Sequence, residues 1–433
     1  MKKVLFVIPL DRSPMGCHEA CLWPLGPLAL EAYCRDLAEF RAINMNWYHK
    51  IGTPENESGL YLSNLPDWDP DIVGISSTFD LCFNSTVLLS GVISEKYPNA
   101  VQVIGGHMVT DKWSDILYLT EAEACCIGEG EKAFRSYLET GEFSHPSWKT
   151  IRSSDEKILD DIDPNDVPCY DFDIYDVKPS GSIQISLSSG CFGRCYFCTL
   201  GASRLRRAKH KGVVKMMDEL LEYNRKWNIT KFFVVDDCPF EDKPYFRSIL
   251  SFMKENNFKA HFFNLPFFNV ETEEDCKLIA SVDFEQWIGI SPDCSCERVH
   301  REITEKRGSW SHVKDVVRWC RKYGLKVLLV ILVGFPEETK DEIEGIVETY
   351  RDIEADHFGV RIVCPLPGSD FAEDVDLRKP LDILGKDYPC GPQCYVDGVD
   401  WTGDWLEMKV PILEQSLNVI AQMRRAKENY QIS

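Results

Sequence analysis

The stretch Ser189-Gly190-Cys191-Phe192-Gly193-Arg194-Cys195-Tyr196-Phe197-Cys198-Thr199 places three cysteines on one short segment. The apolar run Ile183–Leu187 precedes it and the amphipathic run Gly212–Trp227 follows it, which predicts a strand, a loop and a helix. Three thiolates on one loop suit a soft metal centre. A fourth sulfur would complete a structural zinc or iron–sulfur site, and the next cysteine along the chain is Cys238. Three thiolates on a four-iron cube would leave one iron open, while zinc or a chance group of core cysteines are the alternatives.

Apolar runs alternate with amphipathic runs from Ser182 onward. We expect strands at Ile183–Leu187, Lys231–Val235, His261–Asn264, Trp287–Ile290, Lys326–Val333 and Phe358–Val363. We expect helices at Gly212–Trp227, Tyr245–Asn256, Thr272–Ala280, Ser311–Tyr323 and Thr339–Ile353, and a last one at Asp404–Lys427. About six βα units predict a partial barrel rather than a closed eight-fold one.

The first 140 residues show the same alternation. Strands are predicted at Lys3–Pro9, Phe40–Trp47, Ile72–Ser76, Val101–Ile104 and Ala124–Ile127, and helices at Leu25–Leu37, Leu88–Tyr97 and Glu131–Glu139. This order predicts a doubly wound parallel sheet, in which ligands bind beyond the carboxyl ends of the strands. Those ends are followed by residues 9–16, 76–78, 105–107 and 128–131.

The predicted fold class is therefore α/β. A doubly wound sheet (residues 1–140) and a Pro-broken linker (141–181) precede a partial (β/α)6 barrel (182–370). A C-terminal helical and irregular extension (371–433) follows.

Composition narrows the function classes. Hydrophobic residues make up 44% and charged residues 27% of the 433 residues, which excludes disordered and low-complexity chains. A net charge of −21 disfavours nucleic acid and anionic membranes as partners, although Arg204, Arg206, Arg207, Lys209, His210 and Lys211 form a basic run. No apolar run is long enough to span a bilayer. The 18 cysteines without an export signal indicate the reducing cytoplasm.

The cysteine spacing, together with Phe197 just before the last cysteine, resembles the cluster motif of the radical S-adenosylmethionine (SAM) enzymes. The first half resembles the cobalamin-binding domain that is fused to many of these enzymes. The other matching segments, in chain order, are Pro70–Ser77, Ile104–His107, Ile127–Glu131, Phe232–Asp237, Val333–Thr339 and Pro365–Ser369.

The resemblance implies a [4Fe–4S] cluster on Cys191, Cys195 and Cys198, whose open iron chelates SAM. One electron would then break the sulfonium C–S bond, and the resulting deoxyadenosyl radical would abstract hydrogen from substrate in a dry cavity. The residues implied to contact SAM are Phe197, Asp236, Asp237, Ser291, Gly334, Phe335 and Pro336. Ser291 stands where many relatives carry an acidic residue. Solvated carboxylates at Asp236 and Asp237, and a plain turn at 334–336, are the alternatives.

The resemblance also implies cobalamin beside Ser76, Ser77, Gly105, Gly106, His107, Gly128, Glu129 and Gly130. In cobalamin domains with an Asp-x-His-x-x-Gly loop the histidine binds cobalt, and here the corresponding position is Ser13. The nearby imidazoles are His18 and His107, for which loop or surface positions are the alternative. Bound cobalamin makes methylation of an unactivated carbon the leading reaction.

The remaining cysteines give a weaker indication of function than the three on the loop. Cys294, Cys296, Cys364, Cys390 and Cys394 together could hold a second cluster, although scattered thiols are the favoured interpretation. Cys17 and Cys21 are four residues apart beside a predicted ligand loop, where simple packing is the alternative. A C-terminal group, Tyr388, Tyr395, Trp401 and Trp405, is interpreted as core or as a cover for the barrel mouth.

We therefore expect a cytoplasmic, cobalamin-dependent radical SAM methyltransferase. Its substrate would be a small molecule or peptide, and its electron donor a flavodoxin or ferredoxin. One alternative is radical oxidation, rearrangement or cyclisation without methyl transfer, with or without cobalamin. The other is a non-enzymatic iron–sulfur or zinc module. A tRNA methylthiotransferase fits poorly, because no further cluster motif or basic RNA domain is present.

Overall fold

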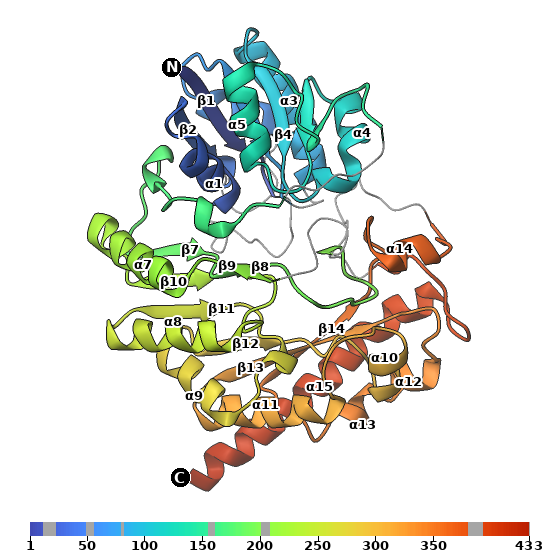
Figure 1. The fold of residues 1–433 in the computed structure, drawn as a ribbon. Coiled ribbons are helices and arrows are strands. Elements are labelled where there is room, and N and C mark those ends of the chain that lie inside the picture. Colours follow the sequence, from blue (N-terminus) through green and yellow to red (C-terminus); the bar gives the residue numbers. More distant parts are fainter. Residues whose placement is uncertain are drawn as a thin grey trace.

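The computed structural model describes residues 1–11, 23–48, 56–78, 82–154, 161–200, 208–379 and 393–432. Figure 1 shows two α/β regions, with the N-terminal sheet region above a second set of parallel strands that is covered by helices on its outer side. Loops from both regions meet between them. No helix within the described residues is both long enough and apolar enough to cross a bilayer.

The N-terminal region is a six-stranded sheet with the order β2-β1-β3-β4-β5-β6. Its parallel strands are β1 (Lys2–Ile8), β2 (Ala38–Asn44), β3 (Ile72–Ser76), β4 (Val101–Gly105) and β5 (Ala124–Cys126), and β6 (Trp148–Lys149) runs antiparallel to β5. Its helices are α1 (Leu25–Cys34), α2 (Glu57–Asn64), α3 (Phe83–Lys96), α4 (Val109–Leu119) and α5 (Glu131–Thr140).

Both faces of this sheet are buried, as a doubly wound fold requires. Alternate residues of β1 enter different clusters: Phe6 packs with Phe134 of α5, while Val7 belongs to the cluster that contains Leu89 of α3. The predicted doubly wound sheet is confirmed.

The second region is a partial barrel of six parallel strands. These are β7 (Ser182–Ile185), β10 (Lys231–Val234), β11 (Lys259–Phe262), β12 (Trp287–Ile290), β13 (Lys326–Val333) and β14 (His357–Ile362). They form the sheets β11-β10-β7 and β12-β13-β14, which a single parallel bridge between Asn264 and Gly289 joins. The partial (β/α)6 barrel is therefore also confirmed.

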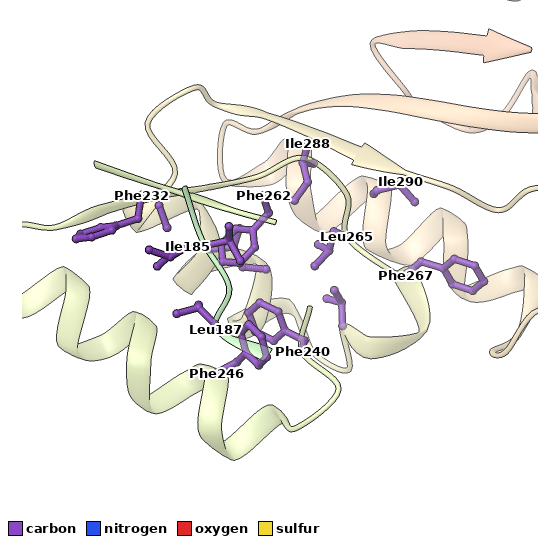
Figure 2. Packing of buried hydrophobic residues seen from close by; sticks show 14 of the residues in the cluster. Ile185, Leu187, Phe232, Phe240, Phe246, Phe262, Leu265, Phe267, Ile288 and Ile290 are labelled. Atoms are coloured by element: carbon purple, nitrogen blue, oxygen red, sulfur yellow. The ribbon is translucent and has the colours of Figure 1, made fainter. Parts of the chain in front are cut away.

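Helices cover the outer face of the barrel. They are α7 (Val213–Trp227), α8 (Lys243–Glu255), α9 (Glu273–Val282), α10 (Glu297–Glu302), α11 (Trp310–Lys322), α12 (Lys340–Glu344) and α13 (Ile346–Tyr350). Phe232 and Phe262 point from their strands into this outer layer, where Phe240 and Phe246 stack at 4.9 Å (Figure 2). Burial of these rings fixes the strands whose carboxyl ends carry the site.

Several elements differ from the sequence-based expectations. Helices α2, α4 and α10 were not anticipated, because their short runs are interrupted by polar residues. The helix expected at Thr339–Ile353 is divided into α12 and α13 at Gly345, a residue that weakens helices. The strand expected at Phe40–Trp47 ends at Asn44, whose side chain accepts a hydrogen bond from Asn46 N and caps a 3-10 turn.

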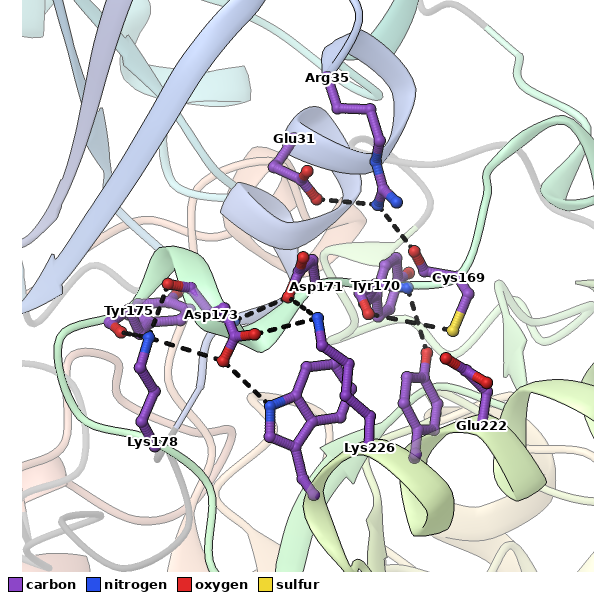
Figure 3. A network of polar contacts seen from close by, with 12 residues as sticks. Glu31, Arg35, Cys169, Tyr170, Asp171, Asp173, Tyr175, Lys178, Glu222 and Lys226 are labelled. Atoms are coloured by element: carbon purple, nitrogen blue, oxygen red, sulfur yellow. Dashed lines mark hydrogen bonds and ion pairs between the residues drawn. The ribbon is translucent and has the colours of Figure 1, made fainter.

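The segment 141–181 connects the two regions through buried and ion-paired side chains. The ring of Phe172 contacts Trp23, which lies just before α1 in the chain, and Tyr223 of α7. Lys226 of α7 forms ion pairs with Asp171 at 2.7 Å and Asp173 at 3.0 Å (Figure 3). The linker segment is therefore fastened to both regions.

The C-terminal residues add α14 (Asp370–Asp374) and the long helix α15 (Gly403–Ile432). Two side chains of α15 bind the backbone of β14, the last barrel strand. Asn418 accepts from Phe358 N at 3.0 Å and donates to Phe358 O at 2.8 Å, and Glu414 accepts from Val360 N at 2.7 Å. Residues 380–392 of the C-terminal extension, including Tyr388 and Cys390, lie outside the described residues.

Candidate functional site

The cysteine loop lies directly after β7 and the short strand β8 (Ser188–Ser189), which pairs with β9 (Lys209–His210). Cys191, Cys195 and Cys198 are free thiols at partly exposed positions. The loop turns because Cys198 N donates to Cys195 O at 3.0 Å, and Gly193 N donates to Cys191 Sγ at 3.1 Å. The three sulfurs do not all lie within 4.8 Å of one another.

Asp236 and Asp237, at the end of β10, hold the start of this loop. The Asp236 carboxylate accepts from Leu187 N and Ser188 N, both at 2.8 Å, and from Ser188 Oγ at 2.6 Å. Asp237 accepts from Gly190 N at 2.8 Å. Burial raises the pKa of Asp236 to about 7, against the lowering effect of these hydrogen bonds. The solvated-carboxylate alternative is therefore wrong for Asp236.

Two ion pairs that sequence reasoning missed flank the cysteine loop. Lys306 is almost completely buried and pairs with Asp293, and Arg307 Nη1 lies 2.6 Å from Glu241 Oε1. Burial raises the pKa of Cys195 to about 11, while the positive charge of Lys306 acts in the opposite direction. Adjacent cations of this kind favour thiolates. The only signal in the sequence was the pair of basic residues before Gly308, a pattern too common to single out.

A fourth cysteine lies beside the loop. Cys238 is 1% exposed, and its sulfur, Cys191 Sγ and a Glu241 carboxylate oxygen all lie within 4.8 Å of one another. The hydrogen bond with Cys238 lowers the pKa of Cys191 to about 7, although burial opposes this. Within the described ranges, no other set of three or more His, Cys, Asp or Glu side chains brings its ligand atoms within 4.8 Å of one another.

The residues expected to contact SAM fall mainly into two groups. Asp236 and Asp237 follow β10, and Phe197 lies near residues 334–336, which follow β13. The rings of Phe197 and Phe335 lie 6.1 Å apart, and Gly334, with φ +97°, donates its N–H to Glu338 at 2.7 Å. Phe335 is fully buried, and Pro336 O accepts a hydrogen bond from Val399 N. Ser291 Oγ donates to Asn264 Oδ1 at 3.5 Å.

A pocket of about 720 Å³ lies between the carboxyl edge of the N-terminal sheet and the mouth of the barrel. This volume is within the range of small-molecule and cofactor sites. Seven of the eight residues expected at cobalamin line the pocket, namely Ser76, Gly105, Gly106, His107, Gly128, Glu129 and Gly130. Ser189, Leu200 and Asp237, which flank or hold the cysteine loop, line it from the barrel side.

The side chains of Ser77, Glu129 and His107, three of the expected cobalamin residues, have partners within the protein. Ser77 is fully buried, with Oγ 2.7 Å from Thr86 Oγ1, and does not line the pocket. Glu129 pairs with Lys209 Nζ at 3.0 Å and accepts from Ile162 N at 2.8 Å. His107 Nε2 lies 3.3 Å from Thr199 Oγ1, one residue after Cys198. His107 and Glu129 therefore bridge the two regions at the pocket.

The other sequence candidates do not gather into a second site. Lys209, His210 and Lys211 pair with Glu129, Asp242 and Glu219, so the described part of the basic run is neutralised. Cys294 and Cys394 are buried, and Cys296 and Cys364 are partly buried; none of these four belongs to a metal-binding group among the described residues. Trp401 is buried and donates to Glu338 O, which supports a core role. Residues Ser13, Cys17, His18, Cys21, Arg204, Arg206 and Arg207 lie outside the described residues.

Gly193 provides a test of the cysteine loop. A Cβ at this position would lie 3.1 Å from Cys191 Sγ and 3.8 Å from Cys195 Sγ, in the space between two expected ligands. We expect Gly193→Ala to lower the iron bound per chain severalfold after anaerobic reconstitution. Gly91→Ala is the control, because nothing lies within 4 Å of a Cβ there. Equal iron content in the two variants would contradict the proposed location of the metal.

Comparison with known proteins agrees with this geometry. Residues 185–350 match the radical SAM superfamily model. An uncharacterized methyltransferase of Pyrococcus horikoshii is 24% identical over 70% of this chain and 68% of its own length. Cytidylyl-2-hydroxyethylphosphonate methyltransferase of Streptomyces wedmorensis is 22% identical over 66% of this chain and 61% of its own length. The chain thus spans about two thirds of these relatives.

Two solved structures share the fold over most of the chain. The radical SAM methyltransferase TsrM of Kitasatospora setae, with cobalamin and a [4Fe–4S] cluster bound, superposes with a TM-score of 0.66 at 15% identity, covering 86% of this chain and 74% of TsrM. The cobalamin-dependent radical SAM enzyme OxsB superposes with a TM-score of 0.69 at 16% identity, covering 92% of this chain and 65% of OxsB. The stretch that holds the cysteine loop and most of the partial barrel, residues 185–350, is thus the part of the chain that matches the radical SAM superfamily, and the two solved structures share its fold.

Proposed function

We propose that the protein is a cobalamin-dependent radical SAM methyltransferase that methylates an unactivated carbon of a small molecule or peptide. The observation that carries this proposal is the shared pocket. Glycine-rich loops of the N-terminal sheet line one side of it, and residues that flank the cysteine loop line the other. A methyl carrier and a radical source would therefore meet in one cavity. The similarity to TsrM and to methyltransferase-named relatives supports the same conclusion.

The residues present fit both groups. Cys191, Cys195 and Cys198 would hold the cluster, with Lys306 and Arg307 beside them as compensating cations. Gly105, Gly106 and Gly128 leave backbone exposed to the pocket, so that a large, flat cofactor could approach closely. When bound, the cluster supplies the electron that cleaves SAM, and cobalamin supplies the methyl group.

The chain's own residues would position these groups. Asp236 and Asp237 fix the entry of the cysteine loop through four hydrogen bonds with the loop and its preceding strand. Glu129 and Lys209 hold the two walls of the pocket together, and the mostly apolar lining limits water near a radical. A small flavodoxin- or ferredoxin-type protein is the proposed electron donor, and the cytoplasm the proposed compartment.

A partial reaction tests this proposal without knowledge of the substrate. The anaerobically reconstituted protein would be incubated with SAM carrying a labelled methyl group, a reductant and cobalamin. We expect deoxyadenosine, and also S-adenosylhomocysteine in an amount stoichiometric with bound cobalamin. Omitting cobalamin should remove the S-adenosylhomocysteine and leave the deoxyadenosine.

The outcomes separate the alternatives. Deoxyadenosine without S-adenosylhomocysteine would favour radical oxidation, rearrangement or cyclisation. Absence of both products from a protein that contains its cluster would support a non-enzymatic module.

A further inference from the structure

The buried thiol of Cys238 has no part in the family motif, yet it lies beside the first cysteine of the loop. It follows Asp237 directly, so it stands on the same connection that holds the loop through four hydrogen bonds. Cys191 Sγ and Cys238 Sγ lie within 4.8 Å of each other. The end of β10 therefore brings a fourth sulfur to Cys191.

Asn269 holds Cys238 in one orientation. Its side chain is fully buried, and its amide Nδ2 donates to Cys238 Sγ at 3.2 Å and to Pro239 O at 2.9 Å. Because the Cys238 sulfur accepts this N–H, its own S–H points toward another acceptor. The acceptors within reach are Cys191 Sγ and Glu241 Oε2, the latter at 3.1 Å.

The carboxylate of Glu241 already has other donors. Arg307 Nη1 donates to Oε1 at 2.6 Å, and Oε2 lies 3.1 Å from Asn269 Nδ2, whose two N–H groups it shares with Cys238 Sγ and Pro239 O. A metal-bound Cys191 sulfur, by contrast, is an anionic acceptor, and among the described residues its one other donor is Gly193 N. The S–H group therefore forms its most favourable hydrogen bond with the Cys191 sulfur once the cluster is present.

We propose that Cys238 is a positioning residue that donates an S–H hydrogen bond to the Cys191 ligand and thereby raises the reduction potential of the cluster. This inference rests on the proposed function, because it requires the three-cysteine cluster. Hydrogen bonds to ligand sulfurs stabilise the more negative, reduced cluster and so raise its potential. Cys238 would make the first electron transfer to the cluster easier.

The test is a redox titration of the reconstituted full-length protein, followed by electron paramagnetic resonance of the reduced cluster. Wild type, Cys238→Ala, Cys238→Ser and Cys276→Ala would be compared. Cys276 is the matched control, because it is fully buried and its sulfur contacts that of Cys320 at 3.6 Å, away from the loop. Iron and labile sulfide would be measured in each sample.

We expect all four proteins to hold the cluster. In Cys238→Ala the ratio of reduced to oxidised cluster at a fixed potential should fall about tenfold, which corresponds to about 59 mV for one electron. Cys238→Ser retains a donor and should recover part of this loss, while Cys276→Ala should match wild type.

Other outcomes would overturn the inference. An unchanged potential in Cys238→Ala, with full cluster content, would show that Cys238 does not donate this hydrogen bond. The proposed function would stay intact. Loss of the cluster in both Cys238 variants would make Cys238 a fourth ligand. A wild-type protein that takes up zinc in place of iron would overturn both proposals.

Discussion

Replacing Cys195 with alanine is expected to abolish formation of deoxyadenosine. Cys195 is the middle cysteine of the loop, and Lys306 acts on its sulfur electrostatically. Two remaining thiolates cannot hold three corners of a cube, so the cluster should be lost or strongly depleted. Product formation by chromatography, together with iron and sulfide per chain, measures the effect. Cys191→Ala and Cys198→Ala should behave in the same way.

Cys169→Ala is the control for this experiment. Cys169 is also a partly exposed free thiol, but it lies in the linker segment and its sulfur contacts the neighbouring Tyr170 O. We expect this variant to retain wild-type iron and product. If Cys195→Ala still formed deoxyadenosine at the wild-type rate, the cluster assignment would be wrong.

Replacing Gly106 with alanine is expected to disrupt the pocket edge of the N-terminal sheet. Gly106 has φ +118°, and a Cβ there would lie 2.1 Å from the carbonyl oxygen of Ser77. The backbone conformation alone costs an alanine about 1–3 kcal/mol, and the clash with backbone adds to this. Because β3 and β4 end side by side at this point, relief of the clash has to move one of the two pocket-lining loops.

The neighbouring glycine offers a close control. A Cβ at Gly105 would meet nothing nearer than 3.9 Å, although Gly105 also lines the pocket. We expect Gly106→Ala to lower the melting temperature by several degrees and to weaken cobalamin binding, measured by absorbance after gel filtration. Gly105→Ala should keep the wild-type melting temperature. Equal melting temperatures in the two variants would show that the Ser77 contact is not rigid.

The sequence patterns predicted the architecture well for a clear reason. Strands such as Lys326–Val333 are continuous apolar runs, because helices or core cover at least one face along their whole length. The spacing of Cys191, Cys195 and Cys198 lies on one loop and is therefore visible without any tertiary information. Short elements such as α10 were missed, since six residues give too little periodicity.

The surroundings of the loop could not be predicted, because they depend on contacts between distant segments. Lys306 reaches Cys195 from a position more than a hundred residues later, and Asn269 orients Cys238 from another connection. The roles of Asp236 also depended on tertiary contacts: its carboxylate holds Leu187 and Ser188, which the sequence places far away. Glu129 was predicted to face a cofactor; it lines the pocket, and its pairing with Lys209 of the second region could not be foreseen.

Two side chains of α15 bind the backbone at the edge of β14, and this limits how a substrate can be recognised. Exposed strand edges usually recruit extended peptides by main-chain pairing. Here the amide of Asn418 and the carboxylate of Glu414 already occupy the free N–H and C=O groups of Phe358 and the N–H of Val360. A peptide substrate would therefore find no template for strand addition at this rim, and its selection would depend on side-chain shape and charge.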